Sequence, residues 1–205
     1  EVWFLENLIK RHQAYETVKR PIERFLATIM FIILSPLLIL IAILVKLSSS
    51  GPTIYRQLRT GRMGTKFILY KFRTMKTDAE AHGPQWSKDN DERITPIGKI
   101  LRYTHLDEFL QLINIIKGDL SFVGPRPERP EFVKNLETTI PYYEIRHLIK
   151  PGLTGWAQIN YRYGSSINDA YQKLQYDIYY LKNRSAILDI AIIIRTIKLF
   201  FINLE

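Results

Sequence analysis

Two adjacent carboxylates, Asp107 and Glu108, are the strongest candidates for chemistry in this sequence. They follow Leu106 where a helix is expected to begin, and the unpaired amides and partial positive charge of a helix amino terminus favour an ionised carboxylate. An ionised Asp107 could act as a nucleophile or as a magnesium ligand. Asp is also a favoured N-cap residue, and acidic residues are common in first turns. From the residues alone, helix capping is the favoured explanation of the pair and catalysis is the alternative.

Basic side chains that could bind phosphate are spread along the chain. Phosphoryl transfer requires cations where negative charge builds up on the transferring oxygens. Arg126 lies between prolines in "GPRPERPEF", which restricts its backbone and favours a fixed guanidinium fork for a phosphate. Asp177, in "LQYDIYYLK", is either a helix-surface acid or a further site residue. The candidate phosphate-binding residues are Lys71, Arg73, Arg102, Arg126 and Arg162, each with a solvated surface charge as the alternative explanation.

The composition limits the classes of protein that could use these residues. The 205 residues suffice for one domain with a core, and the net charge of +9 calls for an anionic partner such as nucleic acid, a membrane surface or a phosphorylated substrate. The absence of Cys excludes disulfides, thiolate nucleophiles and cysteine-based zinc sites. The four histidines show no metal-ligand spacing, so a histidine-based metal site is not expected.

An uncharged hydrophobic segment, residues 25–45, is long enough to cross a bilayer. Basic residues flank it on both sides, and residues 46–77 contain neither Asp nor Glu. Because positive flanks prefer the cytoplasmic side, a helix that crossed would leave one flank on the wrong side. Pro36 disfavours a straight helix, and Ser35 can donate a hydrogen bond to the preceding turn. We therefore expect a re-entrant helix that bends at Ser35-Pro36, with a kinked spanning helix as the alternative.

The remaining pattern predicts an α+β fold that is mostly helical. Residues 54–58 and 67–72 are expected to form a small β-hairpin around the turn with Gly61 and Gly64, and residues 77–94 a loop. Helices are expected at 97–103, 107–117, 129–138, 141–149, 168–182 and 185–203, the last lying against protein or the lipid interface. The expected organisation is a linker or pre-membrane helix at 1–20, a re-entrant helix-break-helix at 21–48 and a cytoplasmic domain with interfacial helices at 49–205.

Together these segments resemble the bacterial sugar transferase family, the monotopic phosphoglycosyl transferases. The resemblance extends over residues 19–203 and includes the Ser35-Pro36 segment. The other motifs follow in order as "YRQLRTGRMG", "YKFRTM", "GKILRYTHLDE", "IKGDLSFVGPRPERPEF", "RHLIKPGLTGWAQIN" and "QYDIYYLKNRS". The "GWAQINYRYG" stretch is similar to the branch in which this unit ends a longer chain with additional transmembrane helices.

The resemblance implies a two-step reaction at the cytoplasmic face of the bacterial inner membrane. Asp107, as nucleophile and magnesium ligand, would take a sugar phosphate from a UDP-sugar and release UMP, with Glu108 assisting. Polyprenyl (undecaprenyl) phosphate would then accept the sugar phosphate, which initiates exopolysaccharide, capsule or O-antigen synthesis. Lys71, Arg102 and Arg126 would hold phosphate groups, and Asp177 is carried over as a further site position. Many members have Leu-Pro after the Asp-Glu pair, where this chain has Phe109-Leu110.

The expected partners are therefore a UDP-sugar, polyprenyl phosphate and membrane lipid, with Mg²⁺ as cofactor and a homo-oligomer left open. Nucleic acid is not among them. Two alternatives of another class remain: a membrane-anchored basic binding protein, and a scaffold of a glycan assembly complex that has no catalytic role. No motif can be assigned to a sugar ring, so glucose, galactose and N-acetylated sugars all stay open as the group transferred.

Overall fold

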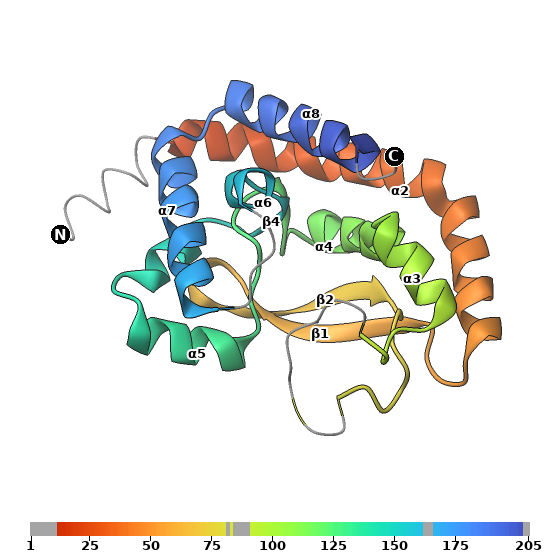
Figure 1. Ribbon diagram of the computed structural model, residues 1–205. Coiled ribbons are helices and arrows are strands. Elements are labelled where there is room, and N and C mark those ends of the chain that lie inside the picture. The colour runs from red at the N-terminus through yellow and green to blue at the C-terminus, as the bar shows by residue number, and fades with distance from the viewer. Residues whose placement is uncertain (1–11, 81–82, 84–90, 162–165, 203–205) are drawn as a thin grey trace.

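Helices lie around two small sheets in the part of the chain that the structure describes (Figure 1). This computed structural model describes residues 12–80, 83, 91–161 and 166–202. The α-helices are α2 (Gln13–Ser48), α3 (Pro96–Tyr103), α4 (Leu112–Lys117), α5 (Pro130–Thr139), α6 (Trp156–Asn160), α7 (Ile167–Asn183) and α8 (Ala186–Ile202). The 3₁₀ turns are η1 (Arg62–Gly64), η2 (Leu106–Gln111) and η3 (Tyr143–Leu148). The predicted α+β class with mostly helical content is confirmed.

Helix α2 is one continuous helix that contains both Pro21 and Pro36. The helix runs without interruption through residue 21 and through Ser35-Pro36, where the sequence led us to expect a boundary and a break. Figure 1 shows instead that α2 turns sharply, with its first half beside α8 and its second half running past α3. Proline inside a helix is a usual cause of such a kink. The hydroxyl of Ser35 donates to the carbonyl of Ile32 at 2.7 Å, which is the predicted bond to the preceding turn.

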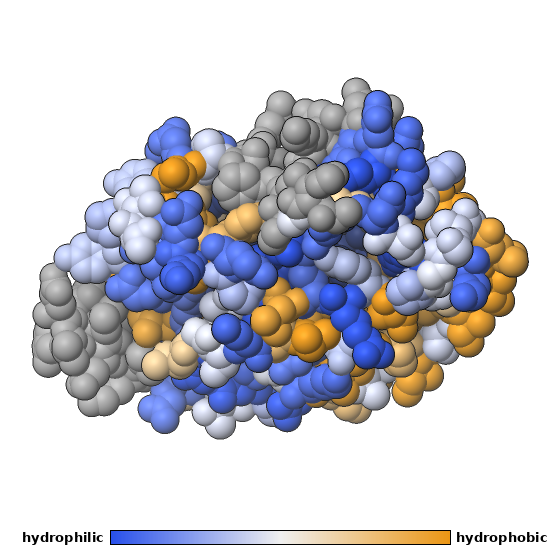
Figure 2. Space-filling model, turned by 90° about the horizontal axis from the view of Figure 1, so that it is seen from below, coloured by the Kyte–Doolittle hydropathy of each residue, from blue (hydrophilic) through white to orange (hydrophobic). Residues whose placement is uncertain are grey.

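One side of α2 packs against the domain and the other is apolar and open. Leu38, Ile41 and Val45 are buried in a core that also contains Phe72 and Leu101. The hydrophobic residues on the other side are exposed, and Figure 2 shows hydrophobic surface at the edge of the molecule where the second half of α2 lies. By length and composition α2 is able to cross a membrane. An apolar surface of this extent on a helix needs lipid or protein to cover it.

The predicted hairpin is present and slightly longer than expected. Strands β1 (Ile54–Thr60) and β2 (Lys66–Phe72) pair antiparallel, with Tyr55 opposite Lys71 and Gln57 opposite Leu69. Because side chains alternate between the two faces of a strand, Gln57, Arg59 and Lys71 point to the same face of the hairpin. Helix α4 and turn η2 pack against β2, so this face lies next to the two carboxylates.

A second sheet was not predicted from the sequence. Strands β3 (Ser121–Val123) and β4 (Gly152–Thr154) pair in parallel, with Val123 opposite Thr154. Close packing continues beyond the strand ends, since a Cβ on Gly152 would lie 2.1 Å from the backbone nitrogen of Gly124. This contact fixes the point at which the proline-rich segment leaves β3.

Two predicted helices differ in form from the expectation. The helix expected at 107–117 begins as the 3₁₀ turn η2 and becomes α4 only at Leu112. The helix expected at 141–149 is the 3₁₀ turn η3. Helix α6 was not predicted, whereas α3, α5, α7 and α8 each lie within about two residues of the expected bounds.

Candidate functional site

Turn η2 carries the carboxylate pair into the interior of the domain. His105, directly before it, adopts a left-handed backbone conformation with φ of 50°, which redirects the chain after α3. Asp107 is buried, with 7% of its surface exposed. Among the residues that the structure describes, no group donates a hydrogen bond to the Asp107 carboxylate, and η2 has no side-chain cap. Helix capping therefore does not explain Asp107.

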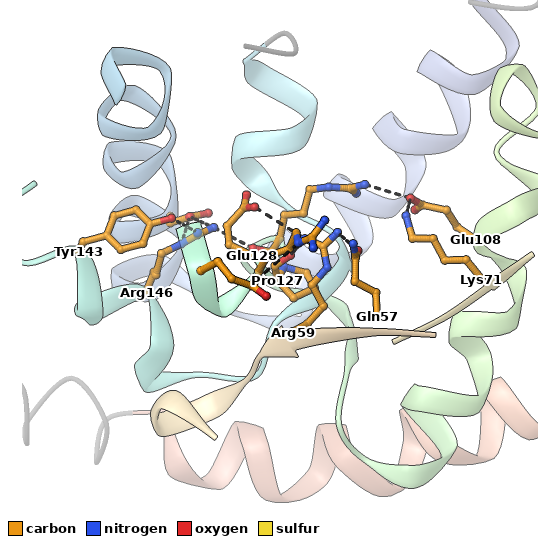
Figure 3. Close-up of polar contacts among 12 residues, drawn as sticks. Gln57, Arg59, Lys71, Glu108, Pro127, Glu128, Tyr143 and Arg146 are labelled. Carbon is orange, nitrogen blue, oxygen red and sulfur yellow. Dashed lines mark hydrogen bonds and ion pairs between the residues drawn. The ribbon is translucent and has the colours of Figure 1, made fainter. Parts of the chain in front are cut away.

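Glu108 is bound by two cations at a single oxygen. Its Oε1 lies 2.6 Å from Nζ of Lys71, on β2, and 3.0 Å from a terminal guanidinium nitrogen of Arg126. Figure 3 shows the Lys71 and Glu108 side chains converging from the hairpin and from η2. Burial alone would raise the pKa of Glu108, but Lys71 and Arg126 lower this pKa to well below its ordinary value. Glu108 is therefore ionised and fixed in orientation.

The neighbouring carboxylate has the opposite electrostatic character. Burial, together with the negative charge of Glu108, raises the pKa of Asp107 to about 6. Lys71, Arg102 and His105 act in the other direction and limit the rise. The helix-start environment thus does not lower the pKa as expected from the sequence, because burial outweighs it. At neutral pH Asp107 is therefore mostly ionised and receives no hydrogen bond from the described residues.

Arg102 approaches Asp107 from α3, which is fixed on the segment after β2. Its Nε donates to Oγ1 of Thr74 at 2.9 Å. Thr95 caps α3 by accepting from the amide of Gly98 at 3.0 Å. A Cβ on Gly98 would lie 2.0 Å from the carbonyl oxygen of Thr74, so only glycine permits this approach. The positive charge of Arg102 lowers the pKa of Asp107, and its predicted role in phosphate binding stays a prediction.

The proline-rich segment 124–128 that carries Arg126 is bonded at each of its residues. The carbonyl of Arg126 accepts from Arg146 at 2.9 Å, and that of Pro127 from Arg59 at 2.8 Å (Figure 3). Backbone partners hold the other three residues: Gly124 donates to Thr154, Pro125 accepts from Gly152 and Glu128 accepts from Thr60, each at 2.9 Å. The sequence predicted a restrained Arg126, and the structure adds that side chains restrain it as much as the prolines do.

Asp177 acts on Arg126 through Arg146. The Oδ2 atom of Asp177 accepts from Nε of Arg146 at 3.0 Å and lies 2.9 Å from a terminal nitrogen of the same guanidinium. The other terminal nitrogen donates to the hydroxyl of Tyr143 at 2.6 Å. Asp177 is 2% exposed. The structure therefore makes Asp177 a partner of the arginine that holds the Arg126 backbone, and not a surface acid.

Among the other predicted positions, Arg73, Ser35 and Pro36 lie outside this cluster. Arg73 is buried, and a terminal nitrogen donates to the carbonyl oxygen of Ser49 at 2.7 Å and to its hydroxyl at 2.8 Å, so Arg73 secures the end of α2. Arg162 lies outside the described residues. Ser35 and Pro36 lie in the apolar part of α2.

Arg59 and Arg146 are site residues that the sequence reasoning missed. Both occur in quoted motifs, "YRQLRTGRMG" and "RHLIKPG", but neither has a spacing or a neighbour that separates it from a surface arginine. Alternation along the hairpin offers one usable signal, because Arg59 and Lys71 occupy the same face. For Arg146 no local signal exists, since its partner Asp177 lies 31 residues away.

The described residues fit a divalent cation only in part. They contain no group of three or more His, Asp or Glu side chains that could hold a metal ion. Asp107 offers an oxygen, whereas Oε1 of Glu108 is taken by Lys71 and Arg126. Mg²⁺ is commonly bound by one or two carboxylates, substrate phosphates and water. The site therefore fits a magnesium ion that arrives with a phosphorylated substrate and uses Asp107 as its protein ligand.

Comparison with known proteins identifies the family to which the chain is similar. The family model described as bacterial sugar transferase matches residues 14–203. A UDP-N-acetylgalactosamine-undecaprenyl-phosphate N-acetylgalactosaminephosphotransferase of Aeromonas hydrophila is 41% identical over 184 residues, which cover 90% of this chain and 44% of the relative. A UDP-glucose:undecaprenyl-phosphate glucose-1-phosphate transferase of Escherichia coli K12 is 39% identical over 188 residues, or 91% of this chain and 40% of the relative.

A third relative is of more similar length. The UDP-glucose:undecaprenyl-phosphate glucose-1-phosphate transferase of Caulobacter vibrioides is 35% identical over 186 residues, which cover 90% of this chain and 70% of the relative. The chain spans about two fifths of the length of the Aeromonas and Escherichia relatives. The region shared by all three contains the two carboxylates and the cations around them.

Proposed function

The chain belongs to the bacterial sugar transferase family, and on this basis we propose that it transfers a sugar 1-phosphate from a UDP-sugar to polyprenyl phosphate. The acceptor is undecaprenyl phosphate, and the reaction takes place at the cytoplasmic face of the bacterial inner membrane. The product initiates a glycoconjugate such as an exopolysaccharide, a capsule or an O-antigen. The names of the relatives support the reaction class, since each combines a UDP-sugar with undecaprenyl phosphate.

In the first step, a carboxylate oxygen of Asp107 attacks the β-phosphorus of the UDP-sugar. A bond forms between this oxygen and phosphorus, and the bond from phosphorus to the bridging oxygen breaks. UMP leaves with that electron pair, so the sugar phosphate is bound to Asp107 as an acyl phosphate. The observation that carries this proposal is the pair itself: a buried carboxylate free of hydrogen bonds from the described residues, beside a second carboxylate held by Lys71 and Arg126.

In the second step, a phosphate oxygen of the polyprenyl phosphate attacks the phosphorus of the sugar phosphate. The acyl phosphate bond breaks and Asp107 is released as a carboxylate, ready for another cycle. The lipid product is a polyprenyl diphosphate sugar. The same cations serve both steps, because each step develops negative charge on the same phosphoryl oxygens.

The fixed cations are the residues that lower the barrier. Lys71 and Arg102 act on Asp107, and Arg126 binds the neighbouring Glu108. All three stabilise the transferring phosphoryl group without reorganising, because each is held by other side chains or by backbone. Glu108 keeps Lys71 and Arg126 together and prevents their mutual repulsion from separating them. Bound Mg²⁺ would add further charge neutralisation at the diphosphate, with Asp107 as the protein ligand.

Helix α2 places this site at the level of the lipid headgroups. Helix α2 inserts its exposed apolar side into one leaflet of the membrane. It bends around Ser35-Pro36 and returns to the membrane face from which it entered. The re-entrant course is supported by the kink and by the basic flanks on both sides of the apolar segment. The phosphate of the acceptor lipid and the water-soluble nucleotide sugar then meet at Asp107.

Topology is tested with single cysteines, since the chain has none of its own. Thr17→Cys and Lys66→Cys introduce exposed thiols on the two sides of the apolar segment. A re-entrant helix predicts that a membrane-impermeant maleimide labels both from the cytoplasmic side. Labelling of the two thiols from opposite sides would establish a spanning helix.

The reaction is tested by UMP release. The protein in detergent, with Mg²⁺ and undecaprenyl phosphate, is given UDP-glucose, UDP-galactose, UDP-N-acetylglucosamine and UDP-N-acetylgalactosamine in separate assays. We expect UMP release and a matching lipid-linked sugar with at least one donor. Release of UMP from none of them, combined with salt-dependent binding of nucleic acid, would favour the basic binding protein instead.

A further inference from the structure

A stripe of polar side chains faces inward from the first half of α2, on the part of the helix that precedes the apolar segment. Tyr15, Lys19 and Glu23 recur every four residues and therefore lie on one side of the helix. The side chains of Lys19 and Glu23 are 8% and 12% exposed. None of these three residues is part of the Asp107 site. Their burial therefore needs a separate explanation, since buried charges cost free energy unless they are well paired.

Two of the three residues bind the backbone of strand β3. Oε1 of Glu23 accepts from the amide of Phe122 at 3.0 Å and from the hydroxyl of Ser121 at 2.7 Å. Nζ of Lys19 donates to the carbonyl oxygen of Val123 at 3.1 Å. Val123 is the last residue of β3, and Arg126 follows three residues later. Side chains of α2 thus hold the strand that leads directly into the arginine segment.

Other elements hold Lys19 in place. Nζ of Lys19 forms an ion pair with Asp189, on α8, at 2.7 Å. Tyr180, on α7, donates to Oδ1 of Asp189 at 2.7 Å, and its hydroxyl also lies 3.2 Å from the Val123 carbonyl oxygen. Tyr15 completes the group with a hydrogen bond to Asp189. The Val123 carbonyl therefore accepts from Lys19 of α2, and the Tyr180 hydroxyl of α7, which accepts from Lys19 at 3.2 Å, holds the lysine beside it.

We propose that Lys19 is a positioning residue for Arg126, because it ties the membrane helix α2 to the end of β3 and so sets where the 124–128 segment places the Arg126 guanidinium. This inference rests on the proposed function, in which Arg126 stabilises the transferring phosphoryl group. Lys19 acts at a distance and contacts neither substrate nor Asp107. The rate of transfer consequently depends on how α2 is seated relative to the domain.

If Lys19 positions Arg126, its substitution should change the kinetics of transfer; if Lys19 only stabilises the fold, it should not. Loss of one charge-assisted hydrogen bond in a positioning role is expected to lower kcat/KM for the UDP-sugar about tenfold or more. Lys19→Met removes the charge and the donor, whereas Lys19→Arg keeps both and is expected to restore activity to within about threefold of wild type. Arg20→Met is the matched control, because it removes a charge from the same helix turn without a bond to β3.

A double-mutant cycle tests the route through Arg126. If Lys19 acts by placing Arg126, then Lys19→Met reduces kcat/KM strongly in the wild type but by less than about twofold in an Arg126→Ala background. Tyr180→Phe removes the hydroxyl that holds Lys19 and Asp189 beside Val123 without changing any charge, so it serves in the same cycle if Lys19→Met folds poorly. The proposal would be overturned if, in both cycles, the loss of kcat/KM in the double variant equalled the product of the two single losses. It would also be overturned if Arg20→Met lowered kcat/KM as much as Lys19→Met does.

Hydrogen exchange supplies a readout that does not depend on turnover. Amides in the peptide 121–126 are expected to exchange faster in Lys19→Met than in wild type or Arg20→Met. Unchanged exchange there would show that Lys19 does not hold β3, whatever the activity. Failure of the wild type to release UMP would instead remove the proposed function, while the exchange comparison would still decide whether the tie between α2 and β3 exists.

Discussion

The turn that carries Asp107 and the segment that carries Arg126 are held in opposite ways. Each residue of segment 124–128 is bonded through its backbone, and Arg59 and Arg146 supply two of these bonds. The Asp107 carboxylate receives no hydrogen bond from the described residues, and its pKa is raised to about 6 by burial and by Glu108. The fold therefore fixes the cations and leaves the Asp107 carboxylate without a hydrogen bond from the described residues. This arrangement is expected where a carboxylate must form a new bond.

Removing the available carboxylate should have the largest effect. Asp107→Asn leaves an amide of the same size that cannot form the acyl phosphate, so we expect UMP release to fall by at least about 10⁴-fold. Glu131→Gln, at an exposed position on α5, is the matched control and should retain wild-type activity. Wild-type turnover by Asp107→Asn would require the covalent mechanism to be abandoned.

The same variant should stabilise the fold at neutral pH. A carboxyl whose pKa is raised on folding destabilises the native state at pH values above that pKa. For Asp107 this destabilisation disappears as the pH falls from about 6 to the lower pKa that the carboxyl has in the unfolded chain. Asp107→Asn should therefore raise Tm at pH 7.5 and differ little from wild type at pH 4. A lowered Tm at pH 7.5 would contradict the electrostatic account of Asp107.

Glu108→Gln should have the next largest effect. The variant keeps the shape but removes the charge that holds Lys71 and Arg126 together, so both cations are expected to shift away from the phosphoryl site. We expect a loss in kcat of about 10²–10³-fold, measured as initial UMP release under saturating donor. A rise in KM with unchanged kcat would mean that Glu108 contributes only to substrate binding.

A smaller effect is expected from the arginine that holds the Arg126 backbone. Arg146→Lys keeps the charge but loses the planar fork that spans Asp177, Tyr143 and the Arg126 carbonyl. We expect kcat/KM to fall about 10–100-fold. Arg56→Lys, at an exposed position on β1, is the control. Equal activities of the two variants would show that the backbone bond to Arg126 is dispensable.

The pH dependence of the first step should be the smallest of the effects predicted here. Only ionised Asp107 can attack, so the first step should slow as the pH falls through about 6. With this pKa, the ionised fraction decreases about tenfold between pH 7 and pH 5. Pre-steady-state UMP release at a series of pH values measures the change. A rate that stays constant down to pH 5 would place the pKa of the nucleophile lower than the structure indicates.

Local sequence patterns were sufficient for the elements that are bounded by local signals. The hairpin followed from alternating residues around Gly61 and Gly64, and the long helices followed from their hydrophobic periodicity. Strands β3 and β4 could not be found in this way, because each has three residues and they pair across 31 positions of sequence. Turn η2 was expected to be α-helical, but the structure shows a 3₁₀ turn that packs against β2. This packing is a tertiary contact, which local sequence patterns do not contain.

The site could be predicted in part for the same reason. Asp107, Glu108 and Arg126 stood out through adjacency or flanking prolines, and these signals are local. Arg73 looked equivalent to Lys71 because only Phe72 separates them, yet Arg73 lies beyond the end of β2 and its side chain binds Ser49. Whether a buried arginine holds backbone or substrate depends on tertiary contacts, which no single motif contains.

Trapping the intermediate is the most direct test of the central claim. Wild-type protein with Mg²⁺ and a radiolabelled UDP-sugar, but without acceptor lipid, is quenched in acid during turnover and mapped by mass spectrometry. The account predicts one equivalent of sugar phosphate on the peptide that contains Asp107, and its loss when polyprenyl phosphate is added before the quench. A preparation that converts donor to lipid product but never carries the label at Asp107 would contradict the account.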